Sequence, residues 1–179
     1  MGVDKAFLQW GNETLLDRAL RLAGTVAEEV RIVGDAEKFG SFTSVVVEDV
    51  YRDRGPLGGI HAALSSTASE LNLMLAVDLP LMKPEFLAYL ITQARGLGAI
   101  VTVPKAGGGF QPLCAVYRRE FASVAEESLR AGKNKIDPLF AKVTTRVIEE
   151  EELVRAGFSA EIFRNVNTPE DLEQARAKV

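Results

Sequence analysis

Short apolar runs separate longer amphipathic segments along most of this chain. In the amphipathic segments, apolar side chains recur at the spacing of one helix face, as Leu15, Leu16, Ala19 and Leu20 do. The apolar runs are short and rich in valine, isoleucine and leucine, which is typical of buried strands. The pattern predicts strands at residues 29–33, 45–47, 71–77, 99–103, 111–117 and 145–148. It predicts helices that end near residues 23, 66, 94 and 131, and a last helix that begins at residue 169.

The strand predicted at 71–77 leads directly to Asp78 and Pro80. An uninterrupted apolar run suits a strand buried on both faces. Pro80 ends it because proline has no N–H to donate to a sheet. We therefore expect Asp78 at the carboxyl end of a central strand, where a carboxylate can hold a divalent cation against a phosphate. An aspartate that only caps the following turn explains the position equally well.

Acidic residues also follow the two preceding predicted strands. Asp35 comes after 29–33 and Asp49 after 45–47, which suits a ligand-binding edge, although either carboxylate can instead form an Asx turn. Gly58 and Gly59 then fall in the first turn of a predicted helix, where each costs about 1 kcal/mol relative to alanine. Without side chains they let a ligand reach backbone N–H groups at the positive helix end. A tight loop that needs glycine is the alternative.

Polar residues with candidate roles also lie near both ends of the sequence. Lys5 stands close to a glycine in a polar segment, where its ammonium can meet phosphate oxygens as a point charge. An ordinary solvated lysine is the alternative. Near the other end, Thr168 precedes Pro169 and two acidic residues. This order predicts an N-cap, a first-turn proline and charges that complement the helix dipole.

Composition limits the possible functions. With 179 residues, 47% hydrophobic and 26% charged, the chain fits one globular domain. A net charge of -4 argues against a broad nucleic-acid-binding face. The single Cys and single His exclude a Cys/His zinc site and a disulfide framework, and any histidine-based triad would need His61. No apolar stretch approaches the roughly 20 residues of a membrane span. We therefore expect a cytoplasmic protein that binds neither nucleic acid nor membrane.

Five ordered motifs carry a resemblance to a known family. They are Met1-Gly2-Val3-Asp4-Lys5-Ala6, Gly55-Pro56-Leu57-Gly58-Gly59-Ile60, Val77-Asp78-Leu79-Pro80, Gln111-Pro112-Leu113 and Asn165-Val166-Asn167-Thr168-Pro169-Glu170-Asp171-Leu172. Together they resemble, from end to end, the molybdenum cofactor guanylyltransferases, and five ordered motifs are specific where each alone is weak. The resemblance implies one α/β domain over residues 1–179. Its fold is a three-layer α/β/α, Rossmann-like nucleotidyltransferase fold with a mostly parallel sheet.

The resemblance also implies a reaction. Members of the family move GMP from GTP to the terminal phosphate of molybdopterin carrying molybdenum, use Mg²⁺ and release pyrophosphate. Lys5 matches the lysine that contacts the GTP phosphates, and Asp78 matches the Mg²⁺ ligand. These two residues are therefore the expected catalytic pair, and the partners expected for the chain are GTP and molybdopterin.

The same resemblance assigns the nucleotide and acceptor contacts. Asp49 matches an aspartate near the base, and Gly58 and Gly59 match glycines that close over the nucleotide. Asn165 and Asn167 match asparagines that face the acceptor or the active site. These assignments complete the site implied by the family.

The chain departs from the family pattern in two places. Asp35 stands where some relatives have an asparagine that contacts guanine, although a carboxylate can accept hydrogen bonds from the N1–H and amino groups of guanine. In the family, a strand and a Leu-Ala-Gly-Gly loop come before the motif matched by Met1 and Gly2. That strand lies inside the sheet, and buried backbone groups need partners. We therefore expect a segment upstream of Met1 that supplies the strand and the phosphate-binding loop.

The sequence leaves three functions open. The first is GMP transfer from GTP to molybdopterin. The second is a related transfer that uses CTP, as in a molybdopterin cytidylyltransferase, or another nucleotide or phosphate acceptor. The third is a nucleotide- or cofactor-binding protein without catalysis. For the assembly we expect a monomer or a weak homo-oligomer, since no sequence feature indicates a specific oligomer.

Overall fold

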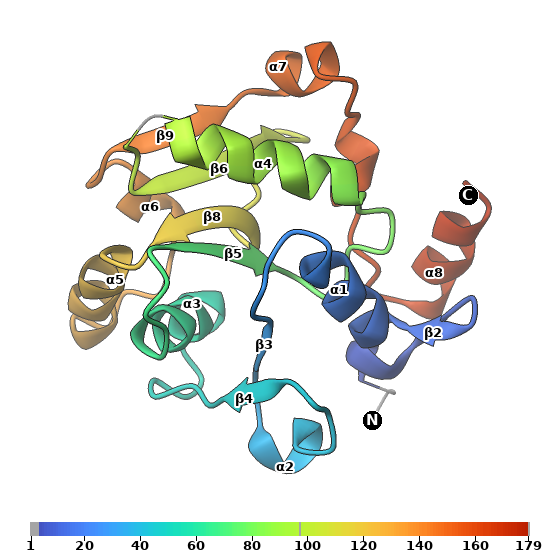
Figure 1. The fold of residues 1–179 in the computed structure, drawn as a ribbon, viewed down its shortest axis with the longest axis horizontal. Helices are drawn as coiled ribbons and strands as arrows, with labels where there is room; N and C mark the ends of the chain where they lie inside the picture. The colour runs from blue at the N-terminus through green and yellow to red at the C-terminus, as the bar shows by residue number, and fades with distance from the viewer. Residues whose placement is uncertain (1–3, 97, 179) are drawn as a thin grey trace.

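The computed structural model describes residues 4–96 and 98–178 (Figure 1). Residues 1–3 of the first motif lie outside this description. The strands are β1 (Gln9–Trp10), β2 (Glu13–Thr14), β3 (Arg31–Val33), β4 (Val45–Val47), β5 (Leu71–Leu75), β6 (Val101–Ala106), β7 (Gly109–Phe110), β8 (Cys114–Arg118) and β9 (Thr145–Ile148). The helices are α1 (Leu15–Gly24), α2 (Ala36–Phe39), α3 (Pro56–Ser65), α4 (Pro84–Gly96), α5 (Phe121–Arg130), α6 (Asp137–Phe140), α7 (Glu150–Arg155) and α8 (Pro169–Arg176), with 3-10 turns η1 (Lys5–Phe7) and η2 (Ala160–Phe163). No helix of the described residues is long and apolar enough to cross a membrane.

The described strands form three separate sheets. The largest sheet has the order β5-β8-β6-β7, and β9 pairs with β6. β3 and β4 pair with each other, as do β1 and β2. Within the large sheet, β5, β6 and β9 share one direction, because β8 is antiparallel to both β5 and β6 while β9 is parallel to β6.

The α/β fold is confirmed, but the expected mostly parallel pairing needs correction in the large sheet. β8 lies between β5 and β6 and runs against both, so most ladders of this sheet are antiparallel. The reason is the connection between β6 and β8. It contains only β7 and a short turn, whereas a parallel return requires a crossover of a dozen or more residues. The β3–β4 and β6–β9 pairs are parallel as expected.

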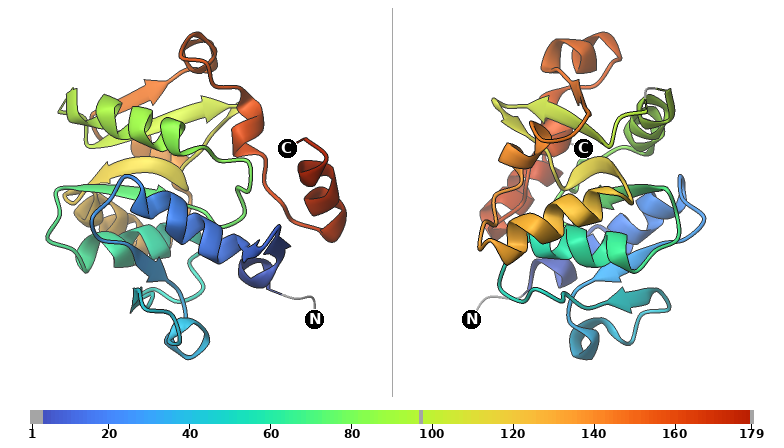
Figure 2. Two further views of the ribbon diagram at one scale, coloured as in Figure 1. Left: turned by 45° about the vertical axis from the view of Figure 1, so that its right-hand side comes forward. Right: turned by 90° about the vertical axis from the view of Figure 1, so that its left-hand side faces the viewer.

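Helices cover both faces of the sheet, as the views in Figure 2 show. Side chains of β5 alternate between the two layers, as the period of a strand requires. Leu73 packs with Phe86 and Leu90 of α4, whereas Met74 packs with Leu57 and other residues of α3 and α5. The three layers are therefore α4 with part of α1, the sheet, and α3 with α5.

An apolar groove separates β5 from β3. Arg31, at the start of β3, donates to the Ser66 carbonyl just after α3, and Val33, at the end of β3, lies beside Gly59 in the first turn of α3. β3 therefore runs antiparallel to α3. β5 follows α3 after a short connection and also runs back along it. β3 and β5 thus share one direction. No strand of the described residues lies between them.

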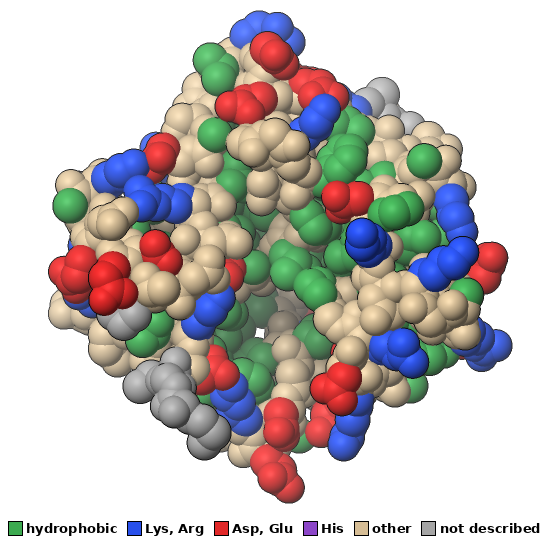
Figure 3. Space-filling model, turned by 180° about the vertical axis from the view of Figure 1, so that it is seen from behind, with side chains coloured by type: hydrophobic (Ala, Val, Ile, Leu, Met, Phe, Trp, Pro, Cys, Tyr) green, Lys and Arg blue, Asp and Glu red, His purple; other side chains and the backbone are tan. Residues whose placement is uncertain are grey.

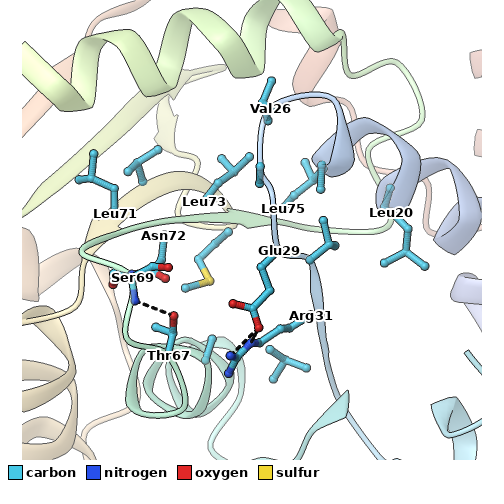
Figure 4. A pocket seen from close by; sticks show the side chains of 18 of the residues that line it. Leu20, Val26, Glu29, Arg31, Thr67, Ser69, Leu71, Asn72, Leu73 and Leu75 are labelled. Atoms are coloured by element: carbon cyan, nitrogen blue, oxygen red, sulfur yellow. Dashed lines mark hydrogen bonds and ion pairs between the residues drawn. The ribbon is translucent and has the colours of Figure 1, made fainter. Parts of the chain in front are cut away.

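This groove makes β5 the edge strand of its sheet rather than the central strand that we expected. The cavity has a volume of about 580 Å³ and is lined by side chains of β5, α1 and the segment that leads into β3, including Leu20, Val26, Leu73 and Leu75 (Figure 4). Seen from behind, the molecule is hollowed, with hydrophobic side chains on the floor and charged ones around the rim (Figure 3). As a result, β5 is only half-buried along its whole length.

Candidate active site

Three of the predicted site residues meet although they come from distant parts of the chain. The Lys5 ammonium lies 3.5 Å from Asp78 Oδ2 and donates a hydrogen bond to Asn167 Oδ1, across 162 residues of sequence. The Lys5 side chain is 41% exposed and that of Asp78 is 19% exposed. A half-exposed ion pair of this kind stabilises a fold by only about 0–1 kcal/mol. The pair therefore adds little to stability, but it brings one cation, one carboxylate and one amide together at the surface.

Buried neighbours hold each member of this cluster in place. Lys5 precedes Ala6, which packs against Leu16 and Ile32. Asn167 follows Val166, which is fully buried against Trp10 and Leu172. Apolar side chains beside a polar site residue fix its backbone while leaving its own side chain free to bind.

Asp78 is fixed in the same way. Val77 packs into the cluster around Ala6, and Leu79 packs beneath α4 with Met82. The Asp78 carbonyl accepts a hydrogen bond of 2.9 Å from the Val166 N–H. This backbone bond joins the loop after β5 directly to the carboxyl-terminal segment that carries Asn167.

The start of α8 orients Asn167. Thr168 is the N-cap, as predicted, and Asp171 completes a capping box with it. The Asp171 carboxylate also accepts the Asn167 N–H at 3.0 Å. Backbone hydrogen bonding from Asn167, with further hydrogen bonds from Thr168, lowers the pKa of Asp171 below its ordinary value. The helix cap and the site residue therefore share one carboxylate.

A second group of predicted residues gathers at the carboxyl ends of β3 and β4. Asp49 Oδ1 accepts the Tyr51 N–H at 2.9 Å, and its other oxygen lies against Gly58. A Cβ added to Gly58 would lie 2.5 Å from Asp49 Oδ2, so only glycine lets this carboxylate sit on the first turn of α3. Gly59 has more room, since its added Cβ would meet Val33 Cγ1 at 3.4 Å.

Asp35 makes a local hydrogen bond, as one of the two alternatives from the sequence predicts. It is the N-cap of α2, and its Oδ1 accepts the Glu37 N–H at 2.8 Å. The Asx-type alternative therefore describes the local structure of both Asp35 and Asp49. Asp35 is exposed, so one carboxylate oxygen stays available beside this cap.

An ion pair connects the two groups. Lys38 of α2 pairs with Asp4, whose other oxygen caps η1 by accepting the Ala6 N–H at 2.9 Å. Asp4 is the immediate neighbour of Lys5. Asn165, in contrast, is exposed and forms no hydrogen bond to Lys5 or Asp78 within the described ranges. The structure thus joins Lys5, Asp78 and Asn167 directly, and links Asp35 to them through α2.

Comparison with known proteins places this geometry in a family. Residues 1–147 match the MobA-like NTP transferase domain. The chain belongs to this family. It is 40% identical over 178 residues to a probable molybdenum cofactor guanylyltransferase of Pelotomaculum thermopropionicum, covering 98% of this chain and 85% of that protein. It is 32% identical over 179 residues to a molybdenum cofactor guanylyltransferase of Desulfosudis oleivorans, covering 99% and 88%.

Solved structures agree with this assignment. The molybdopterin-guanine dinucleotide biosynthesis protein A of Archaeoglobus fulgidus has a TM-score of 0.85 and 26% identity to the chain, covering 99% of this chain and 91% of that one. A 2-C-methyl-D-erythritol 4-phosphate cytidylyltransferase of Thermus thermophilus has a TM-score of 0.70 at 18% identity, covering 97% and 93%, and shares the fold. The chain is therefore a nucleotidyltransferase of the MobA-like family.

Sequence reasoning missed one arginine of this transferase. Arg18 of α1 donates to the carbonyl oxygens of Pro80 and Met82, in the loop that follows Asp78. Burial, followed by the charge of Arg21, lowers the pKa of Arg18, while Glu13 opposes this effect. A signal was present in the sequence. Arg18 lies three residues after Leu15 and four before Leu22, on the stripe of α1 that is otherwise apolar.

Proposed function

We propose that this protein transfers GMP from GTP to the terminal phosphate of molybdopterin carrying molybdenum, and releases pyrophosphate. The observation that carries the proposal is the meeting of Lys5, Asp78 and Asn167 at one surface point. The 40% identity to a probable molybdenum cofactor guanylyltransferase over nearly the whole chain supports the choice of nucleotide and acceptor.

The reaction asks the protein mainly to position anions. An oxygen of the acceptor phosphate forms a bond to the α-phosphorus of GTP while the bond to the departing pyrophosphate breaks. Lys5 neutralises phosphate oxygens, which would draw its ammonium from Asp78 toward the nucleotide. Asn167 remains a donor and acceptor for the acceptor group. A strong general base is not required, because a phosphate monoester is already largely ionised near neutral pH.

The donor set fits Mg²⁺. No cluster of three or more acidic, His or Cys ligands exists in the described part of the chain, so a preformed cage of such side chains is not present there. Mg²⁺ commonly binds through one or two carboxylates together with substrate phosphates and water. Asp78 would supply the carboxylate, and Asn167 Oδ1 lies at the same point. When bound, Mg²⁺ supplies charge that stabilises the phosphates during transfer.

The remaining predicted residues would bind the two substrates. Asp35 and Asp49 would face the base, where a free carboxylate oxygen can accept hydrogen bonds from guanine. Gly58 and Gly59 form the first turn of α3, at the positive end of a helix dipole, with the Asp49 carboxylate against Gly58. Asn165 would contact the acceptor together with Asn167.

The test is a transfer assay with purified protein, Mg²⁺, molybdopterin carrying molybdenum, and GTP labelled at the α-phosphate. We expect label in a molybdopterin–guanine dinucleotide and release of unlabelled pyrophosphate. CTP labelled in the same way serves as the matched control and should yield little product.

Three results would contradict the proposal. Equal turnover of CTP would indicate a cytidylyltransferase or an unselective enzyme. Binding of GTP and molybdopterin without product would indicate the non-catalytic alternative. In competition binding, displacement of a labelled GTP analogue by CTP as readily as by GTP would remove the assignment of guanine.

A further inference from the structure

The loop that carries Asp78 is held by a side chain from a different part of the chain. Arg18 Nε donates to the Pro80 carbonyl at 2.8 Å, and Arg18 Nη2 donates to the Met82 carbonyl at 3.3 Å. These two acceptors follow Asp78 by two and four residues. Within residues 4–96 and 98–178, Arg18 is the only donor to either carbonyl oxygen.

The local sequence explains why these carbonyls need an outside donor. Pro80 interrupts regular pairing, and α4 begins only at Pro84, so the loop between them has few backbone partners. Pro80 and Met82 are both buried, and a buried carbonyl without a donor costs about 1–3 kcal/mol. A planar guanidinium can satisfy both carbonyls at once because its N–H groups form a rigid fork.

Two further contacts hold Arg18 itself. Glu13 Oε1 lies 3.5 Å from Arg18 Nη1, and the guanidinium stands 6.0 Å from the centre of the Trp10 ring. Glu13 is in turn fixed by Arg21, which makes hydrogen bonds of 3.0 and 2.6 Å to its two oxygens. The side chain of Arg18 is only 21% exposed, whereas that of Arg21 is 54% exposed. These contacts hold the Arg18 guanidinium in one position, unlike a solvated surface charge.

We propose that Arg18 is a positioning residue for the transfer reaction: by fixing the Pro80 and Met82 carbonyls, it sets the direction in which Asp78 presents its carboxylate to the metal and to Lys5. This inference rests on the proposed function. Asp78 is tied on its carbonyl side to Val166 and, a few residues later, to Arg18. Without the Arg18 contact, the loop after Asp78 would be free to rotate about the hydrogen bond between Val166 and Asp78.

The experiment compares Arg18→Met with Arg21→Met. Both changes remove a guanidinium that pairs with Glu13, but only the first removes the donors to the loop. Magnesium affinity is measured by calorimetry in the presence of a non-hydrolysable GTP analogue, without the acceptor. We expect Arg18→Met to weaken magnesium binding by about tenfold or more, as loss of a supporting contact around a metal site commonly does. Arg21→Met should stay close to the unchanged protein.

Two further measurements separate positioning from general stability. Arg18→Lys keeps the charge but offers a single donor nitrogen in place of the guanidinium fork, so its magnesium affinity should fall between that of Arg18→Met and that of the unchanged protein. It also decides the question if Arg18→Met does not fold. Thermal unfolding shows whether each variant is folded at the assay temperature. In the transfer assay, kcat should fall more than the KM for GTP rises, because Arg18 touches neither substrate.

Unchanged magnesium affinity in the Arg18 variants would overturn the inference, even if their Tm falls, because Arg18 would then serve stability alone. An equal loss in Arg21→Met would overturn it as well, since the Glu13 network rather than the loop contact would be responsible. Absence of GMP transfer by the unchanged protein would instead contradict the proposed function. That result comes from the transfer assay, whereas the inference about Arg18 is tested by the measurement of magnesium binding.

Discussion

One carboxylate stands at the centre of the proposed chemistry. Replacing Asp78 with Asn keeps the size of the side chain but removes the charge that would hold Mg²⁺ and attract Lys5. We expect transfer to fall by about a hundredfold or more, as when several kcal/mol of preorganised charge stabilisation are lost. The measurement is kcat/KM for GTP over a range of magnesium concentrations. Near-normal turnover at saturating magnesium would remove Asp78 from the site, and Glu85→Gln, an exposed change in α4, serves as the control.

The two glycines of α3 make a matched pair for the second prediction. In Gly58→Ala the new Cβ must displace the Asp49 carboxylate, so we expect a loss of roughly 1–3 kcal/mol in the free energy of unfolding, as overpacking commonly causes. Nucleotide affinity should fall with it. Gly59→Ala meets only Val33 at 3.4 Å and gains up to about 1 kcal/mol of helix propensity, so its stability should be unchanged or higher.

Chemical denaturation and binding of a fluorescent GTP analogue measure both glycine variants. If Gly58→Ala proves as stable as Gly59→Ala, the position of the Asp49 carboxylate does not require a glycine at residue 58.

At the scale of single residues, the sequence assigned Lys5, Asp78 and Asn167 to one site, but it did not indicate which of the assigned side chains touch or how each is held. The contacts of Lys5 with Asp78 and Asn167 agree with the motif assignments. Asp35 caps α2, a local use that a residue type alone does not distinguish from ligand binding. The place of Arg18 on the apolar stripe of α1 indicates its partial burial, but its acceptors could not be predicted, because they are backbone carbonyls 62 and 64 residues away.

Among the elements, α8 connects helix stability to the site. Thr168→Ala removes the N-cap hydroxyl, which should lower the free energy of unfolding by about 1 kcal/mol. Because Asp171 also accepts the Asn167 N–H, a looser cap should raise the KM for the acceptor more than that for GTP. Thermal unfolding and steady-state kinetics measure the two effects. A cap variant with lower stability but unchanged KM values would separate α8 from acceptor binding.

The same cap should respond to acid. The pKa of Asp171 is lower in the folded chain than its ordinary 3.8, because the carboxylate accepts backbone N–H groups of Asn167 and Thr168. Its stabilising contribution is therefore complete above the unfolded pKa and is lost as the pH falls through the folded pKa. Asp171→Asn should thus be less stable than the unchanged protein at about pH 7, with the difference shrinking below about pH 3.8. A difference in Tm that stays constant over this range would contradict the assignment.

Most elements followed from the spacing of apolar residues. The structure places β4 at the predicted residues, and α1 ends at Gly24, one residue after the predicted end. The strand predicted at 111–117 begins only at Cys114, because Pro112 lies in the preceding turn and cannot donate to a ladder. The direction of β8 was not evident from its apolar pattern, since that pattern reports burial and not which neighbour a strand pairs with.

At the scale of the whole molecule, the groove between β3 and β5 gives β5 two different edges. The Ala76 N–H donates to the Leu113 carbonyl, and Arg119 donates to the Glu70 carbonyl, so even-numbered amides of β5 face β8. The amides of Leu71, Leu73 and Leu75 face the groove instead, because successive N–H groups of a strand point to opposite sides.

Hydrogen exchange should show this difference within one strand. We expect the Leu71, Leu73 and Leu75 amides to exchange much faster than those of Asn72 and Met74, since the latter are protected by the ladder with β8. Amide exchange followed by NMR provides the measurement, and each residue serves as the control for its neighbour. Equal protection of both sets would mean that a partner covers the groove edge in solution. The expectation that an upstream segment supplies such a strand stays a prediction.

The bond between Lys5 and Asn167 also has a consequence for synthesis of the protein. The ribosome adds Asn167 162 positions after Lys5. At about 5–20 residues per second, many seconds pass between the synthesis of these two residues. β3 and β4 come early in this interval and can pair with each other before Asn167 is made. The cluster of Lys5, Asp78 and Asn167 therefore forms only after these earlier elements have had time to fold.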